Sequence, residues 1–597
     1  MPAGFSPVFL PSRIGANYAF YMPAAISAET APLGTILWLQ PFAEEANCAR
    51  RHLVAAVREC QRHGIGSLIL DLSGCGESDG DLEGASLGDW LDEIQHALDW
   101  LEQRTAGPVW LGGLRAGALL ATHAASLRKV SGVVLWQPVL SGRSVIDQFL
   151  RQQLAVDWAQ GSAANAAQIL AGLRETLVRG EAITVAGYTL CAGLAADLGA
   201  MEVSIEALAR SKIVLLESRS VGTATSSLSP GLEKFCTALQ AAGAEVFTGS
   251  CEATPFWAAH EAPLTPAVAH VLASTLLRTM QVIDETLRAD PVADMCTSSP
   301  SGSHLMVLPI AEGVIATLHD GLHETADANP GMGVIMLTGG MQIRAGSHRQ
   351  YLLLARTLAA EGYAVLRLDF PGFGDSPGTP RHYAANADVI VAAIAELQER
   401  KPELRGFVLW GLCDGASAAA LHACADERVM SVLMVNPWLD DVAEHVGLSG
   451  YYHRRLMSPQ FWRSLLCGEV GVMRGAVGFM RHVWHKLFAP VEDGKRMTAA
   501  ENSGERGDSA SDIWSALGSL SGRVMVVTGE ADRTGQAFLA MLARRPGVQQ
   551  GVRQVMVPQA DHTFSTPQWH AALTEHTRVT MAREAQRLRT GRAGGAK

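Results

Sequence analysis

The chain has 597 residues and a net charge of −11 at neutral pH, with 48% hydrophobic and 18% charged residues. This length predicts more than one domain, and the composition is that of a globular protein with sizeable apolar cores. The negative charge argues against a general nucleic-acid-binding protein, so we expect no nucleic-acid partner.

The ten cysteines form no CxxC pair and no Cys/His cluster with zinc-ligand spacing, so we predict no metal centre. Neither dinucleotide-binding nor P-loop glycine patterns occur in a suitable context, and we expect no cofactor. The first residues carry no basic segment followed by an apolar run, and no stretch of eighteen apolar residues occurs. We therefore expect a cytoplasmic protein with reduced thiols.

Short apolar runs alternate with helical patterns along the N-terminal half. Strands are expected at 7–10, 18–21, 34–41, 67–71 and 109–111, and helices at 50–63 and 87–103. Alternation of this kind predicts βαβ units and a mainly parallel sheet.

The same order of elements returns in the C-terminal half. Equal distances separate Asp71 from Asp369 and Gly113 from Gly411. Self-similarity over half the chain predicts two copies of one fold. We place the copies at 1–288 and 304–590, with a polar linker at 289–303 and a tail at 591–597.

Each copy carries a long insert, at about 141–210 and 441–520, which we expect to form a mainly helical cap. The second insert includes 451–490, a segment rich in Lys, Arg and aromatic residues. This segment predicts either a cap with a solvated basic face or an amphipathic surface for peripheral membrane contact.

The strongest motif is Gly411-Leu-Cys413-Asp-Gly415, between an apolar run and an alanine-rich helical run. It has the form of the nucleophile elbow of α/β-hydrolases, with cysteine in place of serine. A thiol at a helix N-terminus is favoured as thiolate by the helix dipole. We predict Cys413 as the nucleophile.

A cysteine nucleophile needs a base, and the base needs a carboxylate that orients it. His562 follows the last expected strand and is the predicted base, and Asp532 follows the strand at 524–528 and is the favoured acid. Glu530 and Asp440 are rivals for the acid.

An acyl intermediate also needs hydrogen-bond donors for its oxyanion. We expect the Asp414 N–H to supply one and the N–H of Gly340 or Met341 the other. Arg344 is predicted either to contact an anionic substrate group or to form a structural salt bridge, and Trp438 is a further candidate for substrate binding.

The first copy keeps the elbow glycines but has Arg115 at the nucleophile position, and a guanidinium cannot attack an acyl carbon. His260 lies a few residues late for the base and is expected in the following helix. We therefore predict a pseudo-hydrolase. Because the helix dipole disfavours a cation at this position, Glu44 or Glu45 is expected to pair with Arg115, unless an anionic ligand binds there.

These motifs also resemble a known pair of families. The second half resembles the type 1 exosortase A system-associated hydrolases, through Gly-Ser-His-Arg-Gln at 346–350 and Gly-Leu-Cys-Asp-Gly-Ala at 411–416. The first half resembles the type 2 family, through Pro-Phe-Ala-Glu-Glu at 41–45, Gly-Leu-Arg-Ala-Gly-Ala at 113–118 and Pro-Phe-Trp at 255–257. The resemblance implies two fused α/β-hydrolase domains linked to bacterial exopolysaccharide production, without a defined substrate.

The sequence thus predicts an α/β protein that acts as an ester or thioester hydrolase on a small-molecule or lipid-linked acyl substrate. Transfer of the acyl group to a hydroxyl by the same triad is an alternative. A non-catalytic scaffold that binds partners in both clefts is another.

Overall fold

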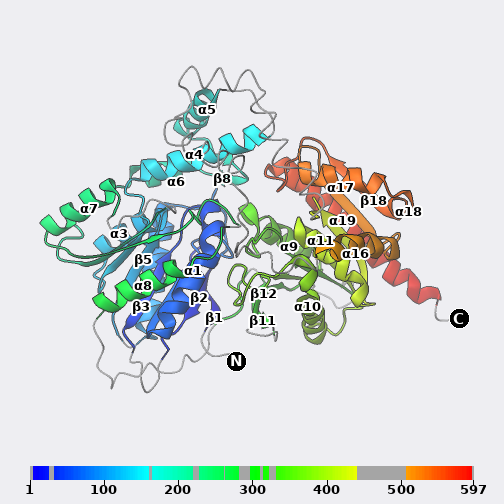
Figure 1. The fold of residues 1–597 in the computed structure, drawn as a ribbon, viewed down its shortest axis with the longest axis horizontal. Coiled ribbons are helices and arrows are strands. Elements are labelled where there is room, and N and C mark those ends of the chain that lie inside the picture. The colour runs from blue at the N-terminus through cyan, green and yellow to red at the C-terminus, as the bar shows by residue number, and fades with distance from the viewer. Residues whose placement is uncertain are drawn as a thin grey trace, which may run out of the picture.

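The computed structural model describes residues 5–25, 32–105, 107–159, 165–219, 228–260, 262–280, 296–300, 302–308, 313–321, 331–439 and 506–594. These residues form two halves that lie side by side, each with its own central sheet (Figure 1).

The first half is built on an eight-stranded sheet with the order β1-β2-β4-β3-β5-β6-β9-β10. Its strands are β1 (Ser6–Pro11), β2 (Ala16–Met22), β3 (Gly34–Leu39), β4 (Ile65–Leu70), β5 (Val109–Leu114), β6 (Val133–Trp136), β9 (Lys212–Arg219) and β10 (Glu245–Glu252). The pairs β1–β2 and β2–β4 are antiparallel, and the remaining pairs are parallel.

The second half repeats this topology with the order β11-β12-β14-β13-β15-β16-β17-β18. Its strands are β11 (Ser303–Leu308), β12 (Val314–His319), β13 (Met332–Leu337), β14 (Ala364–Leu368), β15 (Gly406–Leu412), β16 (Val429–Val435), β17 (Val524–Gly529) and β18 (Val552–Val557). The central strands are buried along their whole length, as expected for parallel strands with helices on both faces. The predicted fold class, two tandem mainly parallel sheets flanked by helices, is confirmed.

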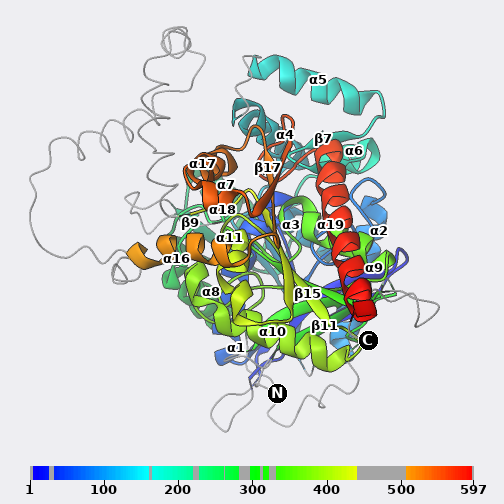
Figure 2. The same cartoon turned by 90° about the vertical axis from the view of Figure 1, so that its right-hand side faces the viewer.

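Helices cover both faces of each sheet. Those of the first half are α1 (Glu44–Arg62), α2 (Leu87–Glu102), α3 (Ala116–Leu127), α7 (Pro230–Ala241) and α8 (Pro266–Thr279). Those of the second are α9 (Gln350–Ala360), α10 (Ala387–Arg400), α11 (Asp414–His422), α16 (Arg506–Ser519), α17 (Arg533–Ala543), α18 (Pro546–Gln549) and α19 (Pro567–Gly594). Figure 2 shows α19 running along the second half in red, where it contacts α9 and the strands β16, β17 and β18.

Helix α1 begins at Glu44, six residues before the helix expected at 50–63. Its first turn carries Glu44 and Glu45, whose negative charges suit a helix N-terminus. The polar residues at 44–47 therefore belong to the helix rather than to the preceding loop, and this brings their side chains into a defined arrangement.

The first insert forms a cap of three helices and a small hairpin, which Figure 1 shows above the first sheet. Its elements are α4 (Gly142–Ala159), α5 (Ala166–Val178), β7 (Ile183–Val185), β8 (Tyr188–Leu190) and α6 (Ala192–Ala200). Of the second insert, 441–520, the part before α16 lies outside the described residues, as does the basic segment 451–490. Among the helices that are described, none is both long and apolar enough to span a bilayer.

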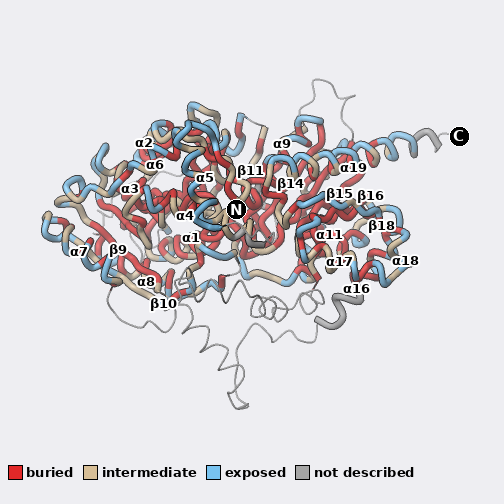
Figure 3. Tube along the Cα trace, turned by 90° about the horizontal axis from the view of Figure 1, so that it is seen from above, coloured by how far each residue is buried: buried red, intermediate tan, exposed pale blue. Residues whose placement is uncertain are grey.

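The two halves meet through buried charged residues. Arg50 Nη1 lies 2.7 Å from Asp71 of its own half and its Nε lies 2.6 Å from Asp375 of the other. In the opposite direction, Arg367 Nη2 lies 2.7 Å from Glu77 of the first half. Buried charges persist only when they are paired, and the pairs Arg50–Asp375 and Arg367–Glu77 each join residues of the two halves. Figure 3 shows buried segments in both halves and between them.

Candidate active site

Cys413 lies at the sharp corner between β15 and α11. Its backbone has φ 60° and ψ −129°, a conformation that L-residues rarely adopt. The flanking glycines allow the corner to pack closely. A Cβ on Gly411 would lie 2.2 Å from the Gly415 carbonyl oxygen, and one on Gly415 would lie 2.4 Å from the Leu337 carbonyl oxygen. The strand, turn and helix therefore form a nucleophile elbow.

His562 and Asp532 reach this corner from two later loops. His562 Nδ1 lies 2.9 Å from Asp532 Oδ1, and the His562 side chain lies close enough to the Cys413 thiol for each group to shift the pKa of the other. Asp532 is itself fixed, because its Oδ2 accepts a 2.6 Å hydrogen bond from the Gly535 N–H at the start of α17. The structure thus brings the three predicted residues together as thiol, imidazole and carboxylate in series.

The ionisation of the pair follows from this geometry. Burial lowers the pKa of His562, but the hydrogen bonds to Asp532 and Cys413 outweigh burial and hold this pKa well above 6.5. Burial raises the pKa of the Cys413 thiol, and the hydrogen bond to His562 opposes that rise. Because the titrations of the two groups are coupled, the pair loses its protons in two steps. After the first step, Cys413 can be a thiolate beside a protonated His562.

Asn436, which was not predicted from the sequence, joins the loops that carry Asp532 and His562. Its Nδ2 donates a 2.8 Å hydrogen bond to the His562 carbonyl, and its Oδ1 accepts one of 2.8 Å from the Gly529 N–H. The side chain is fully buried and has φ 41°. The only sequence signal was an Asn-Pro pair directly after a strand, a common turn pattern.

His348 supports the same site from the other side. Its Nε2 lies 3.0 Å from the carbonyl oxygen of Thr563, the residue after His562. Burial lowers the pKa of His348, so its imidazole is neutral near pH 7 and donates this hydrogen bond.

The predicted oxyanion donors differ in availability. The Gly340 N–H donates a 2.6 Å hydrogen bond to Asp414 Oδ1, so it is engaged by a side chain instead of being open to a substrate oxygen. The prediction that the Gly340 N–H donates to the oxyanion is therefore wrong. Met341 and the Asp414 N–H stay as the predicted donors, and Met341 has φ 59° at the tip of this loop.

Arg344 does not face a substrate site. It is fully buried, its Nη1 lies 2.6 Å from Asp369 and 3.0 Å from Asp375, and its guanidinium stacks over the Tyr18 ring at 5.1 Å. The substrate-binding alternative is wrong, because the buried carboxylates between the halves require this cation.

Two other candidates lie near the elbow. The Trp438 N–H donates a 3.2 Å hydrogen bond to the Cys413 carbonyl, and its role in substrate binding stays a prediction. The rival acid Glu530 accepts a hydrogen bond from the Gln559 N–H at 2.8 Å instead of facing His562. The other rival, Asp440, lies outside the described residues.

The corresponding corner of the first half has nearly the same backbone conformation but carries arginine in place of cysteine. Arg115 has φ 56° and ψ −118°, close to the values of Cys413. Its guanidinium contacts Glu45 with two hydrogen bonds of 2.9 and 3.2 Å, contacts Gln148 at 2.7 Å and lies over the Trp257 ring at 5.0 Å. Glu45 therefore supplies the anion beside Arg115.

Glu44 contacts a histidine and not Arg115. Its Oε1 lies 2.7 Å from His260 Nε2. His260 lies in the loop between β10 and α8, which begins at Pro266, so its expected placement in the following helix is wrong. The proline at the start of α8 fixes the helix start beyond this histidine.

Parts of the chain are similar in sequence to known proteins. Residues 334–575 match the model of the alpha/beta hydrolase family. A segment of 124 residues is 34% identical to human "Protein ABHD12B"; it covers 19% of this chain and 33% of that protein, so the match spans a third of the relative's length.

Solved structures show similarity at low sequence identity. Est1E from Butyrivibrio proteoclasticus, with bound ferulic acid, is 14% identical, with a TM-score of 0.33 and coverage of 45% of this chain and 98% of its own. A Pyrococcus furiosus esterase is 14% identical, with a TM-score of 0.33 and coverage of 47% and 90%. XC6422 from Xanthomonas campestris, described as an a/b serine hydrolase without lid, is 17% identical, with a TM-score of 0.29 and coverage of 48% and 95%. The family-model match at residues 334–575 includes Cys413, Asp532 and His562, so this part of the chain is similar to the alpha/beta hydrolase family.

Proposed function

We propose that the chain is an acyl ester or thioester hydrolase that uses Cys413, His562 and Asp532. The observation that carries this proposal is the series in which the strained Cys413 elbow lies beside His562 and His562 is hydrogen-bonded to the buried Asp532 carboxylate. Such a series is the arrangement by which a nucleophile, a base and an orienting acid act in acyl transfer.

In the first half of the proposed reaction, the Cys413 thiolate attacks the acyl carbon and the carbonyl oxygen becomes an oxyanion. The Asp414 and Met341 N–H groups are the proposed donors to this oxyanion. Collapse of the intermediate breaks the bond to the leaving alcohol or thiol, which takes a proton from His562. The product is a thioester between Cys413 and the acyl group.

In the second half, His562 removes a proton from water, and the resulting hydroxide attacks the thioester. The acid is released, and the proton on His562 returns the pair to its starting state. Asp532 stabilises the imidazolium in both halves because its Oδ1 accepts from Nδ1. If a hydroxyl compound takes the place of water, the same residues catalyse acyl transfer.

The substrate class rests on the motif resemblance. Both halves resemble hydrolases associated with the exosortase A system, which supports an acyl substrate connected with bacterial exopolysaccharide production. A lipid-linked substrate would bring the enzyme to a membrane surface, and the basic segment 451–490 is the proposed contact.

The test is turnover of p-nitrophenyl esters and acyl thioesters by the wild type and Cys413→Ala. We expect the variant to lose at least about a thousandfold in kcat. Cys424→Ser, which alters an exposed thiol, is the control and should leave kcat unchanged.

Three further outcomes separate the alternatives. Accumulation of an acylated acceptor in competition with water would establish transfer as the reaction. If Cys413→Ala keeps wild-type turnover, the assignment of Cys413 as the nucleophile is wrong. If the wild type turns over none of these substrates and an activity-based thiol probe fails to label Cys413, the scaffold alternative gains support.

A further inference from the structure

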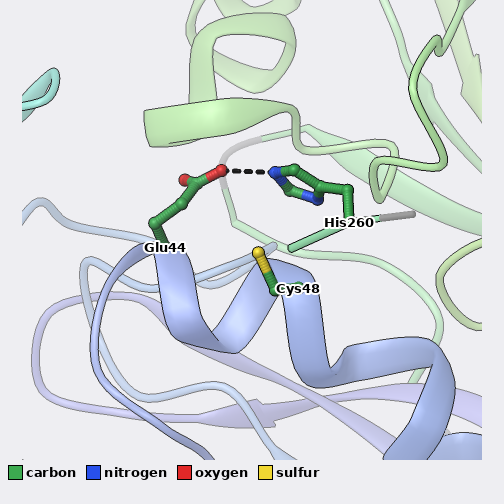
Figure 4. Close-up of side chains that lie close together, drawn as sticks. All are labelled: Glu44, Cys48 and His260. Carbon is green, nitrogen blue, oxygen red and sulfur yellow. Dashed lines mark hydrogen bonds and ion pairs between the residues drawn. The ribbon is translucent and has the colours of Figure 1, made fainter. Parts of the chain in front are cut away.

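A second group of reactive side chains lies in the first half, away from Cys413. Glu44 and Cys48 are one turn apart on α1, so both point to the same side of the helix. His260 reaches them from the loop after β10, and Figure 4 shows the three side chains converging. One carboxylate oxygen, one sulfur and one imidazole nitrogen all lie within 4.8 Å of one another.

We propose that Glu44, Cys48 and His260 bind a divalent transition-metal ion, with zinc as the expected ion. Thiolate, imidazole and carboxylate are the three ligand types that zinc takes from proteins. One thiolate and one carboxylate balance the charge of a dication, which removes the cost of burying an unpaired charge. Three protein ligands leave a fourth position for water.

The hydrogen-bond partners of Glu44 favour a preorganised metal site. Its Oε2 accepts hydrogen bonds from the Tyr188 hydroxyl at 2.5 Å and from Asn47 Nδ2 at 3.2 Å. Its Oε1 accepts one from the Ser347 hydroxyl at 3.0 Å. Partners of this kind orient a ligating carboxylate and strengthen metal binding.

The burial of Cys48 decides against a second acyl-transfer centre. Its relative exposure is 5%, so an acyl substrate cannot reach the sulfur. A metal ion needs no such access for a bulky group. The ion would join α1 to the loop of His260 and, through Ser347, to the second half of the chain.

The first measurement is cobalt binding by the untagged full-length protein after removal of metals with a chelator. We expect one equivalent of Co²⁺ to bind and to give the near-ultraviolet absorption band of a cobalt–thiolate bond. Cys48→Ser should abolish this band. Cys60→Ser, which alters another buried thiol on α1, should keep it, and so should Cys413→Ser.

The second measurement is zinc affinity by competition with a chromophoric chelator. We expect His260→Ala and Glu44→Gln each to weaken zinc binding at least tenfold, and Tyr188→Phe to weaken it about tenfold. Near-ultraviolet circular dichroism of each variant checks its fold, so a loss of binding in a folded variant supports the site.

A different result would overturn the proposal. It fails if the metal-free protein binds no cobalt with a thiolate band, or if that band survives in Cys48→Ser. It also fails if folded His260→Ala and Glu44→Gln retain wild-type zinc affinity, because the three residues would then form only a hydrogen-bonded cluster. These outcomes are independent of turnover at Cys413, so the hydrolase assignment and the metal site can fail separately.

Discussion

Cys413 and Arg115 occupy the same left-handed corner in the two copies of the fold, with φ values of 60° and 56°. In the second copy this corner carries the proposed nucleophile, and the first copy keeps the same strained backbone with a residue that cannot attack an acyl carbon. Packing explains this: Cβ atoms on Gly113 and Gly117 would lie 2.2 and 2.1 Å from carbonyl oxygens, so the corner is also a structural element of the sheet.

Replacement of Asp532 by Asn should change the pH dependence of the cysteine. In the wild type, the contact with Asp532 helps to hold the pKa of His562 well above 6.5, and the protonated imidazole in turn opposes the rise that burial causes in the pKa of the Cys413 thiol. Asp532→Asn removes this support, so the midpoint for iodoacetamide labelling of the Cys413 thiolate should move to higher pH. We expect kcat to fall about 10³–10⁴-fold as well.

Labelling is read by mass spectrometry at the level of individual peptides, so that the exposed Cys424 serves as an internal control in each sample. Glu530→Gln is the matched variant, because Glu530 contacts the Gln559 N–H rather than the imidazole. An unchanged midpoint in Asp532→Asn, or an equal shift in Glu530→Gln, would contradict the role given to Asp532.

Asn436→Ala should slow turnover without touching the substrate. The change removes the hydrogen bond to the His562 carbonyl and leaves the Gly529 N–H without its acceptor. We expect a loss of about 1–3 kcal/mol in unfolding free energy and a fall of about 10–100-fold in kcat with a smaller change in KM.

Asn436→Asp keeps the acceptor for Gly529 and offers a second comparison. Chemical denaturation and steady-state kinetics measure both effects. A variant with wild-type kcat would show that the loops hold their arrangement without this side chain.

Arg344→Met should destabilise the junction of the two halves. The substitution leaves Asp369 and Asp375 with one cation fewer in a fully buried site, which costs about 3–5 kcal/mol of unfolding free energy. Arg381→Met breaks an exposed ion pair with Asp388 and should change stability by less than about 1 kcal/mol. Urea denaturation compares the two, and equal effects would argue against the buried junction.

Glu77→Gln should alter how stability depends on acid. Burial raises the pKa of Glu77, but Arg367 outweighs burial and the pKa lies far below 4.5. A depressed carboxyl pKa contributes stability that is fully present above about pH 4.5 and is lost as pH falls below it. The variant should therefore be less stable at pH 7 and lose less stability between pH 5 and 3 than the wild type.

Unfolding free energies at several pH values test this slope, with Glu102→Gln as the control on an exposed pair with Arg128. If the unfolding free energies of the wild type and Glu77→Gln fall by the same amount between pH 5 and 3, protonation of Glu77 does not cause the acid-dependent loss of stability.

The elbow and its partners could be predicted because each follows the end of a strand, and strand ends of a parallel sheet gather at one edge. Cys413, Asp532 and His562 all obey this rule. Arg344 was ambiguous because the Tyr18 ring beneath its guanidinium belongs to the other half and becomes its neighbour only when the halves pack. His260 was missed because a long stretch of the first half separates it from Glu44 and no local pattern connects them.

The hairpin of the first cap has a further consequence for the second half. Gly187 between β7 and β8 has φ 89°, and a Cβ there would lie 2.4 Å from the His348 ring, whose Nε2 holds the Thr563 carbonyl beside His562. The hairpin of the first half therefore packs against the histidine that holds the His562 loop of the second half. A side chain larger than glycine at position 187 would displace this ring, so the placement of His562 depends on a residue of the other half.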